Sequence, residues 1–271
     1  MTYEEWMTSG DPRRMLDLIR STVESALLRT DGGNHTVFEV FQCSQWEPHE
    51  RKCRLISCAF SRSVWGLLSD ERSRAAVEVA ELEADGLASN KDLDAAWQDA
   101  VHACDKIEGS RGSNPSARWH AARACAVTAW CSFRPGGNPD PDLYGYSPAF
   151  YAATSACIAT GEARGFLDGG NDPIHLRISV QKINAEIIRD AYGPLLFPKL
   201  LDPNWKREIP ESVLRMAGET YSRRDFRLLP AIGDLLEEAG CSEPTVITHC
   251  RLQGRHYPGC WVIDDLLGKF K

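Results

Sequence analysis

The sequence predicts an all-α protein, built as an irregular array of antiparallel helices. Apolar residues recur every three or four positions along most of the 271 residues, which is the periodicity of an amphipathic helix. Segments rich in glycine and proline separate these stretches, and residues that cap helices stand at several of their starts. One segment differs: "TVFEVFQ" alternates apolar and polar residues, so we expect one short β-hairpin or flap near residues 35–46.

The first long helix is expected to begin at Asp11 as the N-cap, with Pro12 at the first helical position, where its missing N–H is tolerated. The pair Gly32 and Gly33 ends it. A second helix follows, beginning near "HERKC". Its apolar face is formed by Leu55, Ile56, Ala59, Phe60, Val64 and Leu67.

Capping residues position the next two helices. Ser69 or Asp70 can cap "ERSRAAVEVAELEA", and Gly86 stands where a helix C-terminus favours a left-handed residue. Ser89 and Asp92 have the spacing of a capping box, with Asp in place of the usual Glu. Together with the preceding helix, these segments predict a layer of three helices joined by short turns.

A loop rich in proline and glycine, "RPGGNPDPDLYGYSP", divides the chain. We expect one helical domain over residues 1–271, with possible halves at 1–132 and 147–271 that this loop joins. The C-terminal half resumes the helical pattern. Its later helices are expected at about residues 212–221, at about residues 226–239, and after Ser242, with Pro244 inside the first turn.

Charge and composition exclude several classes of function. The formal net charge is -7, and the sequence holds no long cluster of Lys and Arg, which argues against binding to nucleic acid. No segment approaches the roughly 18–20 apolar residues that a membrane helix needs. The first residues are acidic, unlike those of a secretory leader. We expect a cytoplasmic protein that binds neither nucleic acid nor membrane.

The ten cysteines do not indicate disulfides, because the chain is neither small nor evidently exported. We expect reduced thiols. Several lie in alanine-rich helical segments, where cysteine packs as a small apolar side chain. Core packing is expected for Cys104, Cys125, Cys131 and Cys157.

The C-terminal segment "HCRLQGRHYPGCW" gathers metal-binding side chains. Cys250, His256 and Cys260 are the leading candidates, with Cys241 or His249 as a fourth ligand, and tetrahedral zinc accepts such sets. The spacing matches no usual zinc knuckle, however. A structural turn that buries Cys260 beside Trp261 explains the same residues. We therefore expect no cofactor, with zinc as the alternative.

No complete catalytic constellation can be written from the sequence. His249 and Cys250 are neighbours on a predicted helix and would point about 100° apart, so they do not form a nucleophilic pair. A helical turn joining His256 to Cys260 is disfavoured by the intervening proline and glycine. The glycine pairs lack the Lys-Ser/Thr of a phosphate-binding loop.

Two tryptophans are candidates for binding a partner. Most of the eight tryptophans fall on apolar helix faces, whereas Trp46 and Trp205 have few apolar neighbours in the sequence. Exposed aromatic side chains often anchor protein interfaces. If exposed, Trp46 and Trp205 would serve as anchors for another protein.

Several stretches together carry a resemblance that covers most of the chain, among them "TYEEWMTSGDPRRMLDLI", "IIRDAYGPLLFPKLLDPNW" and "LPAIGDLLEEAGCSEPTVITHC". They resemble a family of uncharacterised proteins abundant in planctomycete bacteria. Where that family carries a doubled cysteine and paired arginines, this chain has Cys58, Phe60, Ser61 and Arg62. The resemblance implies a bacterial helical protein, and because the family has no assigned activity it implies no chemistry.

These observations favour a non-catalytic protein that acts as an interaction or scaffold module for another protein. The alternative is a small zinc-binding or hydrolytic protein that uses the C-terminal cysteines and histidines.

Overall fold

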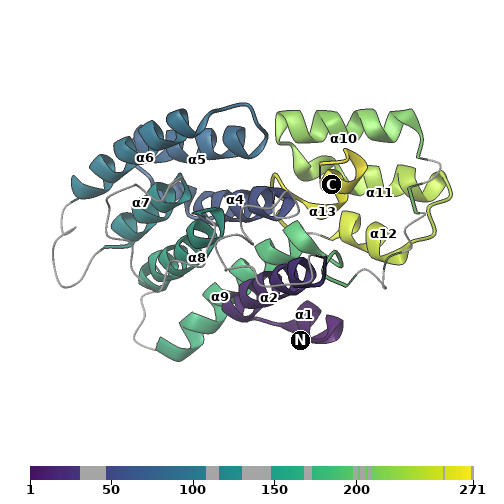
Figure 1. The fold of residues 1–271 in the computed structure, drawn as a ribbon, viewed down its shortest axis with the longest axis horizontal. Coiled ribbons are helices and arrows are strands. Elements are labelled where there is room, and N and C mark those ends of the chain that lie inside the picture. Colours follow the sequence, from purple (N-terminus) through teal and green to yellow (C-terminus); the bar gives the residue numbers. More distant parts are fainter. Residues whose placement is uncertain are drawn as a thin grey trace. The chain divides into compact units, whose positions relative to one another are not determined.

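A computed structural model of the chain describes residues 1–30, 47–107, 116–129, 148–167, 173–197, 201, 205–206, 209–252 and 254–269. These residues form twelve α-helices and no strand, which confirms the predicted all-α class (Figure 1). The hairpin or flap expected near residues 35–46 lies outside the described residues.

The contacts divide the chain into two compact units. Unit 1 consists of Met1–Thr8 and Glu186–Lys271, and unit 2 consists of Ser9–Ala185. The boundary between them in the sequence falls inside one helix, Pro173–Tyr192, rather than at the proline-rich and glycine-rich loop. The N-terminal helix therefore belongs to the same unit as the C-terminal segment.

The described residues of unit 2 form seven helices, the last of which continues into unit 1. They are α2 (Pro12–Thr30), α4 (Glu47–Arg62), α5 (Glu71–Ala84), α6 (Asn90–Asp105), α7 (Ala117–Thr128), α8 (Pro148–Leu167) and α9 (Pro173–Tyr192). Within this unit α8 packs against α4 and α7, and α5 packs against α6 (Figure 1).

The predicted caps of unit 2 are confirmed. The Asp11 carboxylate accepts hydrogen bonds from the backbone N–H groups of Arg13 and Arg14 at the start of α2. Asp70 caps α5, and Ser89 caps α6 with the complete capping box. These local interactions fix the helix starts before any tertiary contact is needed.

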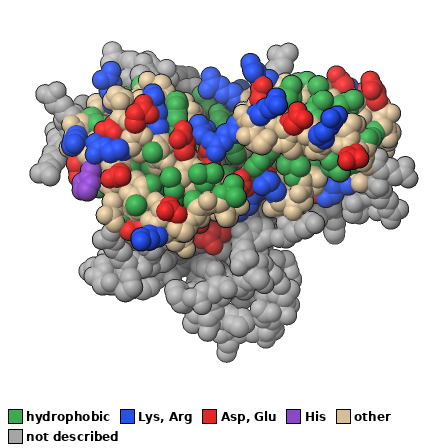
Figure 2. Space-filling model, turned by 90° about the horizontal axis from the view of Figure 1, so that it is seen from above, with side chains coloured by type: hydrophobic (Ala, Val, Ile, Leu, Met, Phe, Trp, Pro, Cys, Tyr) green, Lys and Arg blue, Asp and Glu red, His purple; other side chains and the backbone are tan. Residues whose placement is uncertain are grey.

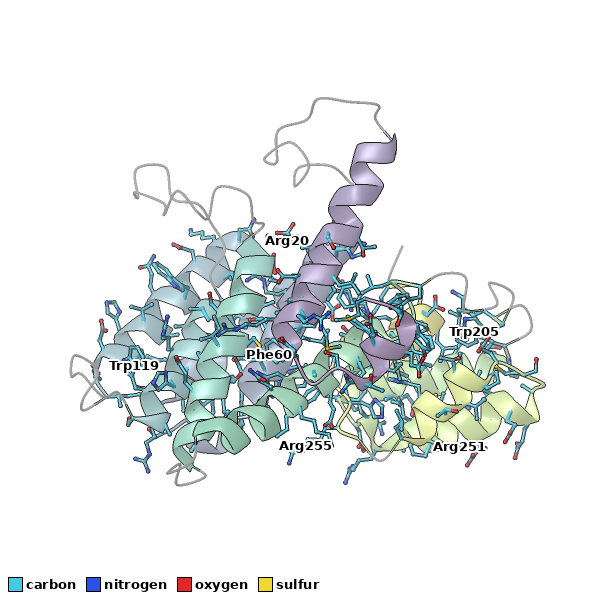
Figure 3. All side chains as sticks on the ribbon, turned by 90° about the horizontal axis from the view of Figure 1, so that it is seen from below. Arg20, Phe60, Trp119, Trp205, Arg251 and Arg255 are labelled. Carbon is cyan, nitrogen blue, oxygen red and sulfur yellow. The ribbon has the colours of Figure 1, made fainter. Side chains whose placement is uncertain are left out.

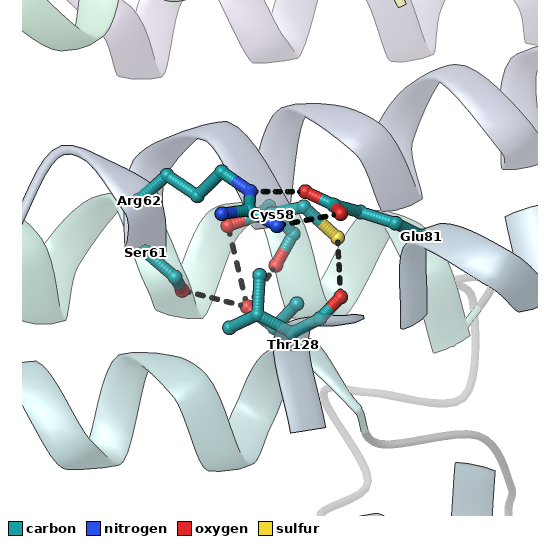
Figure 4. A network of polar contacts seen from close by, with 7 residues as sticks. Cys58, Ser61, Arg62, Glu81 and Thr128 are labelled. Atoms are coloured by element: carbon teal, nitrogen blue, oxygen red, sulfur yellow. Dashed lines mark hydrogen bonds and ion pairs between the residues drawn. The ribbon is translucent and has the colours of Figure 1, made fainter. Parts of the chain in front are cut away.

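The core of unit 2 is rich in alanine and cysteine, which allows its helices to approach closely. Cys104, Cys125 and Cys157 are buried as predicted, and Cys131 lies outside the described residues. Polar contacts also join the helices. Ser61 lies 3.0 Å from the Thr128 hydroxyl, and the Arg62 guanidinium forms two hydrogen bonds with the carboxylate of Glu81, which is 2% exposed (Figure 4).

Unit 1 contains the remaining helices around a second core. They are α1 (Tyr3–Thr8), the end of α9, α10 (Glu211–Arg223), α11 (Leu229–Glu238), α12 (Pro244–Arg251) and α13 (Trp261–Leu266). The expected helix at about residues 226–239 is a short 3₁₀ turn, Phe226–Leu228, followed by α11. The N-cap of α12 is Glu243 rather than Ser242, because the Glu243 carboxylate accepts from the Thr245 N–H.

The prediction that Trp205 anchors a partner required an exposed side chain, and this side chain is buried. Its side chain, labelled in Figure 3, is 8% exposed. It belongs to the same core cluster of unit 1 as Leu229 and Trp261. The other candidate, Trp46, lies outside the described residues.

The surface of the described residues is mixed in charge. On the face that Figure 2 shows, Lys and Arg side chains are interspersed with Asp and Glu and with apolar side chains. No helix within the described ranges is both long and apolar enough to cross a membrane.

Candidate metal centre

Four side chains of unit 1 bring their polar atoms to one place. Asp190 lies in the last turn of α9, His249 on α12, His256 on the segment after α12, and Cys260 directly before α13. One ligand atom from each residue lies within 4.8 Å of the others. The group could therefore hold a metal ion.

The end of α9 directs the Asp190 carboxylate toward the other three candidate ligands. The helix stops at Gly193, whose φ of +47° is a left-handed conformation that favours glycine. The side chain of Asp190 is only 7% exposed. Its Oδ2 accepts a hydrogen bond of 3.0 Å from the Tyr257 backbone N–H, which orients Oδ1 toward the two histidines.

Each histidine directs a single ring nitrogen at the other ligands. His249 Nε2 lies 3.2 Å from Cys260 Sγ and 3.3 Å from Asp190 Oδ1. His256 Nδ1 lies 2.5 Å from Asp190 Oδ1 and 4.0 Å from Cys260 Sγ. The two nitrogens, the oxygen and the sulfur thus converge on one small volume.

Aromatic packing holds the His249 ring in this orientation. The ring meets His256 edge-on at a centroid distance of 5.0 Å and lies 5.2 Å from the Trp261 ring. Trp261 itself is 1% exposed and packs directly on Gly193. The turn after α9 therefore supports His249 through the indole.

Burial and charge shift the protonation of the group. Burial raises the pKa of Asp190, but hydrogen bonds and charge from His249 and His256 outweigh it and hold that pKa well below its usual range. Burial lowers the pKa of His256, and the hydrogen bond and charge of Asp190 outweigh this and raise it. Burial and the Asp190 charge both raise the pKa of Cys260 well above its ordinary value.

This arrangement differs from a cysteine protease-like triad. In such a triad, opposite nitrogens of one imidazole contact the thiol and the acid. Here the same nitrogen of His249 faces both Cys260 and Asp190. In addition, Cys260 is fully buried with a raised pKa, whereas a nucleophilic cysteine is an accessible thiolate. Convergent oxygen, nitrogen and sulfur donors instead form the kind of set that binds a transition metal.

The structure brings together some of the sequence candidates and separates others. His256 and Cys260 lie in the group, and so does His249, which the sequence offered as an alternative fourth ligand. Cys250 is buried on α12 against α11, where a Cβ added to Gly233 would lie 2.8 Å from its Cβ. Cys241 is half-buried and packs against the same core. Neither Cys241 nor Cys250 belongs to the group.

Asp190 was not identified from the sequence. It lies 66 residues before His256, and the sequence does not indicate that the two side chains meet. One signal was present. A carboxylate in the last turn of a helix faces the negative end of the helix dipole, an unfavourable position that calls for a compensating partner.

In comparisons with known proteins, no family model, no curated protein and no solved structure matches the chain. Fold and site together define the class: an all-α protein with a buried group of Asp190, His249, His256 and Cys260 that could hold a metal ion.

Proposed function

We propose that the protein binds one zinc ion through Asp190, His249, His256 and Cys260, and that this ion has a structural role. The donor set supports zinc over magnesium or calcium. Imidazole nitrogen and thiolate sulfur are ligands of zinc and of neighbouring transition metals, whereas magnesium and calcium prefer oxygen.

Two of the distances between ligand atoms fit a tetrahedral site, and the 4.0 Å between His256 Nδ1 and Cys260 Sγ would shorten on metal binding. Ligand atoms at normal zinc bond lengths stand about 3.3–3.7 Å apart along the edges of a tetrahedron. The two distances from His249 Nε2, 3.2 Å to sulfur and 3.3 Å to oxygen, are close to this range. The 2.5 Å contact between His256 and Asp190 is a hydrogen bond, and it would open by about 0.8 Å when a metal replaces the shared proton.

A structural role is favoured because the protein itself supplies all four ligands. Catalytic zinc sites keep one position open for water or substrate, while structural sites are closed. The side chains of the four residues are at most 11% exposed. The burial of all four ligands favours a zinc-binding protein over a hydrolytic one. The scaffold role for another protein stays a prediction.

Metal analysis of the purified protein tests the proposal. We expect about one zinc per chain by elemental analysis, and a content under about 0.2 per chain after growth and purification with zinc would contradict it. Replacement of zinc by cobalt(II) adds a test of geometry. A tetrahedral site with one thiolate gives strong visible d–d bands and a sulfur-to-cobalt charge-transfer band.

Two variants assign the charge-transfer band. Cys260→Ser should remove the band, because Cys260 is the thiol of the group. Cys241→Ser is the matched control, since Cys241 lies in the same unit but outside the group. A band that survives in Cys260→Ser and disappears in Cys241→Ser would assign the site to a different ligand set.

A further inference from the structure

We propose that metal binding at this site controls the folding of unit 1, including the N-terminal helix α1, and leaves unit 2 folded. The inference rests on the proposed zinc function. It goes further because it makes the metal a switch for one defined part of the chain, to which the two ends Met1–Thr8 and Glu186–Lys271 both belong.

Two ligands stand next in the sequence to residues that hold the core of unit 1. Cys260 precedes Trp261, which is 1% exposed and packs on Gly193. His249 precedes Cys250, which is fully buried against α11 at Gly233. Fixing these ligands to one metal ion therefore also fixes α12 and α13 against α11 and the end of α9.

A third ligand, Asp190, connects the site to α1. Asp190 follows Arg189, whose Nη1 donates a hydrogen bond of 3.3 Å to the backbone carbonyl of Trp6. Trp6 is fully buried, and its ring lies 6.2 Å from that of Phe197. Tyr3 meets the same Phe197 edge-on at 5.5 Å. These contacts attach α1 to the end of α9 and to the turn that follows it.

Helix α1 depends on these contacts for its stability. It has six residues, and isolated helices this short are not stable in water. If the end of α9 loses its fixed position, α1 loses both the hydrogen bond to Arg189 and the aromatic contacts with Phe197. We therefore expect the N-terminal helix to melt with the C-terminal segment, although the whole of unit 2 separates them in the sequence.

Metal removal leaves hydrogen bonds among the buried ligands, such as the one between His256 and Asp190, in place of the stronger bonds to a metal. Asp190, His249, His256 and Cys260 would then lie inside unit 1 as a carboxylate, two imidazoles and a thiol. Metal binding by a structural site contributes free energy comparable to the whole stability of a small domain. Unit 1 therefore depends on the metal.

Unit 2 has its own source of stability. Its core cluster includes Val77, Leu93 and Cys125, and none of the four ligands belongs to this unit. The four ligands lie outside this core cluster. We expect unit 2 to remain folded.

Hydrogen–deuterium exchange of the full chain tests the inference. The protein is loaded with zinc, its metal content is measured, and half is stripped with a chelator. Amide protection in α1, the end of α9 and α10–α13 should fall at least about a hundredfold in the stripped sample. Protection in α5–α7 should change by less than about threefold, which makes unit 2 an internal control. Adding zinc back should restore unit 1, whereas magnesium should not.

The outcomes separate the two proposals. A loaded sample that contains no zinc contradicts the proposed function, and the inference fails with it. Stoichiometric zinc with equal protection in loaded and stripped samples leaves the zinc site standing and overturns the inference. A loss of amide protection confined to residues 249–260, or one that spreads equally into α5–α7, also overturns the inference. Because chelation replaces mutation, a variant that cannot fold does not confuse the result.

Discussion

Gly193 and Trp261 are packed so closely that a Cβ added to Gly193 would lie 2.4 Å from the indole Nε1. Gly193 also has a φ of +47°, so any other residue there is strained as well as crowded. The indole in turn lies 5.2 Å from the ring of His249. The contact thus connects the turn after α9 to a candidate metal ligand.

Gly193→Ala is expected to lower the free energy of unfolding by about 2–4 kcal/mol, because it combines backbone strain with a clash against Trp261. By displacing the indole, it should also weaken zinc binding by about tenfold, as changes in the groups that support metal ligands do. Chemical denaturation and a competitive chelator measure the two effects.

Gly218→Ala is the control for that variant. Gly218 lies within α10, and a Cβ there meets no atom within 4 Å. It should raise the free energy of unfolding by about 0.5–1 kcal/mol through helix propensity, with no change in zinc affinity. Equal effects of the two variants would show that Gly193 has no special role.

Single substitutions should distinguish the ligand set in the structure from the set predicted by sequence. Asp190→Asn is expected to weaken zinc binding by about 100-fold or more, because it removes the carboxylate ligand and its charge. Cys250→Ser should retain stoichiometric zinc while losing stability, since Cys250 packs in the core and not in the group. Isothermal titration of both variants with zinc measures their affinity and stoichiometry. Wild-type affinity in Asp190→Asn would exclude it as a ligand.

Zinc binding should strengthen as the pH rises. His256 and Cys260 both have raised pKa values and must lose their protons to bind the metal. The apparent association constant should therefore rise about tenfold per pH unit for each proton released. Competition titrations between about pH 6 and about pH 8 measure the slope, and a flat profile would contradict binding through these groups.

In the metal-free protein, the stability of unit 1 should instead fall as the pH rises from about 6 to about 8. The raised pKa of His256 gives stability that is fully present below its unfolded value of 6.5 and is lost as the pH rises through the folded value. The lowered pKa of Asp190 gives stability that is present above its unfolded value of 3.8 and is lost as the pH falls through the folded one. Residual protection of unit 1, corrected for intrinsic exchange, should thus be greater near about pH 6 than near about pH 8.

In unit 2, the contact between Arg62 and Glu81 is expected to matter more than ion pairs at the surface. Glu81→Gln should lower the free energy of unfolding by about 1–3 kcal/mol, since the carboxylate is 2% exposed and accepts two hydrogen bonds. Glu71→Gln is the control. Glu71 pairs with Arg74 while 82% exposed, so its loss should cost less than about 0.5 kcal/mol by urea denaturation.

The sequence by itself determined the helical class and many of the helix ends. Asp11, Ser89 and Gly86 act within one turn of their own position, through a capping side chain or a left-handed conformation. Such local effects can be identified without knowledge of the fold. The same holds for the burial of Cys125 and Cys157, which the surrounding alanines indicate.

Only the tertiary structure decided which polar side chains meet. His249 and Cys250 are adjacent in the sequence, and the rotation of α12 against α11 turns Cys250 into the core and His249 toward the site. Trp205 lacks apolar neighbours along the chain but gains them from helices that follow it. Asp190 becomes a candidate ligand only because α9 ends beside the segment before α13. Helix signals depend on near neighbours in the chain, whereas a metal site depends on distances between remote segments that packing alone sets.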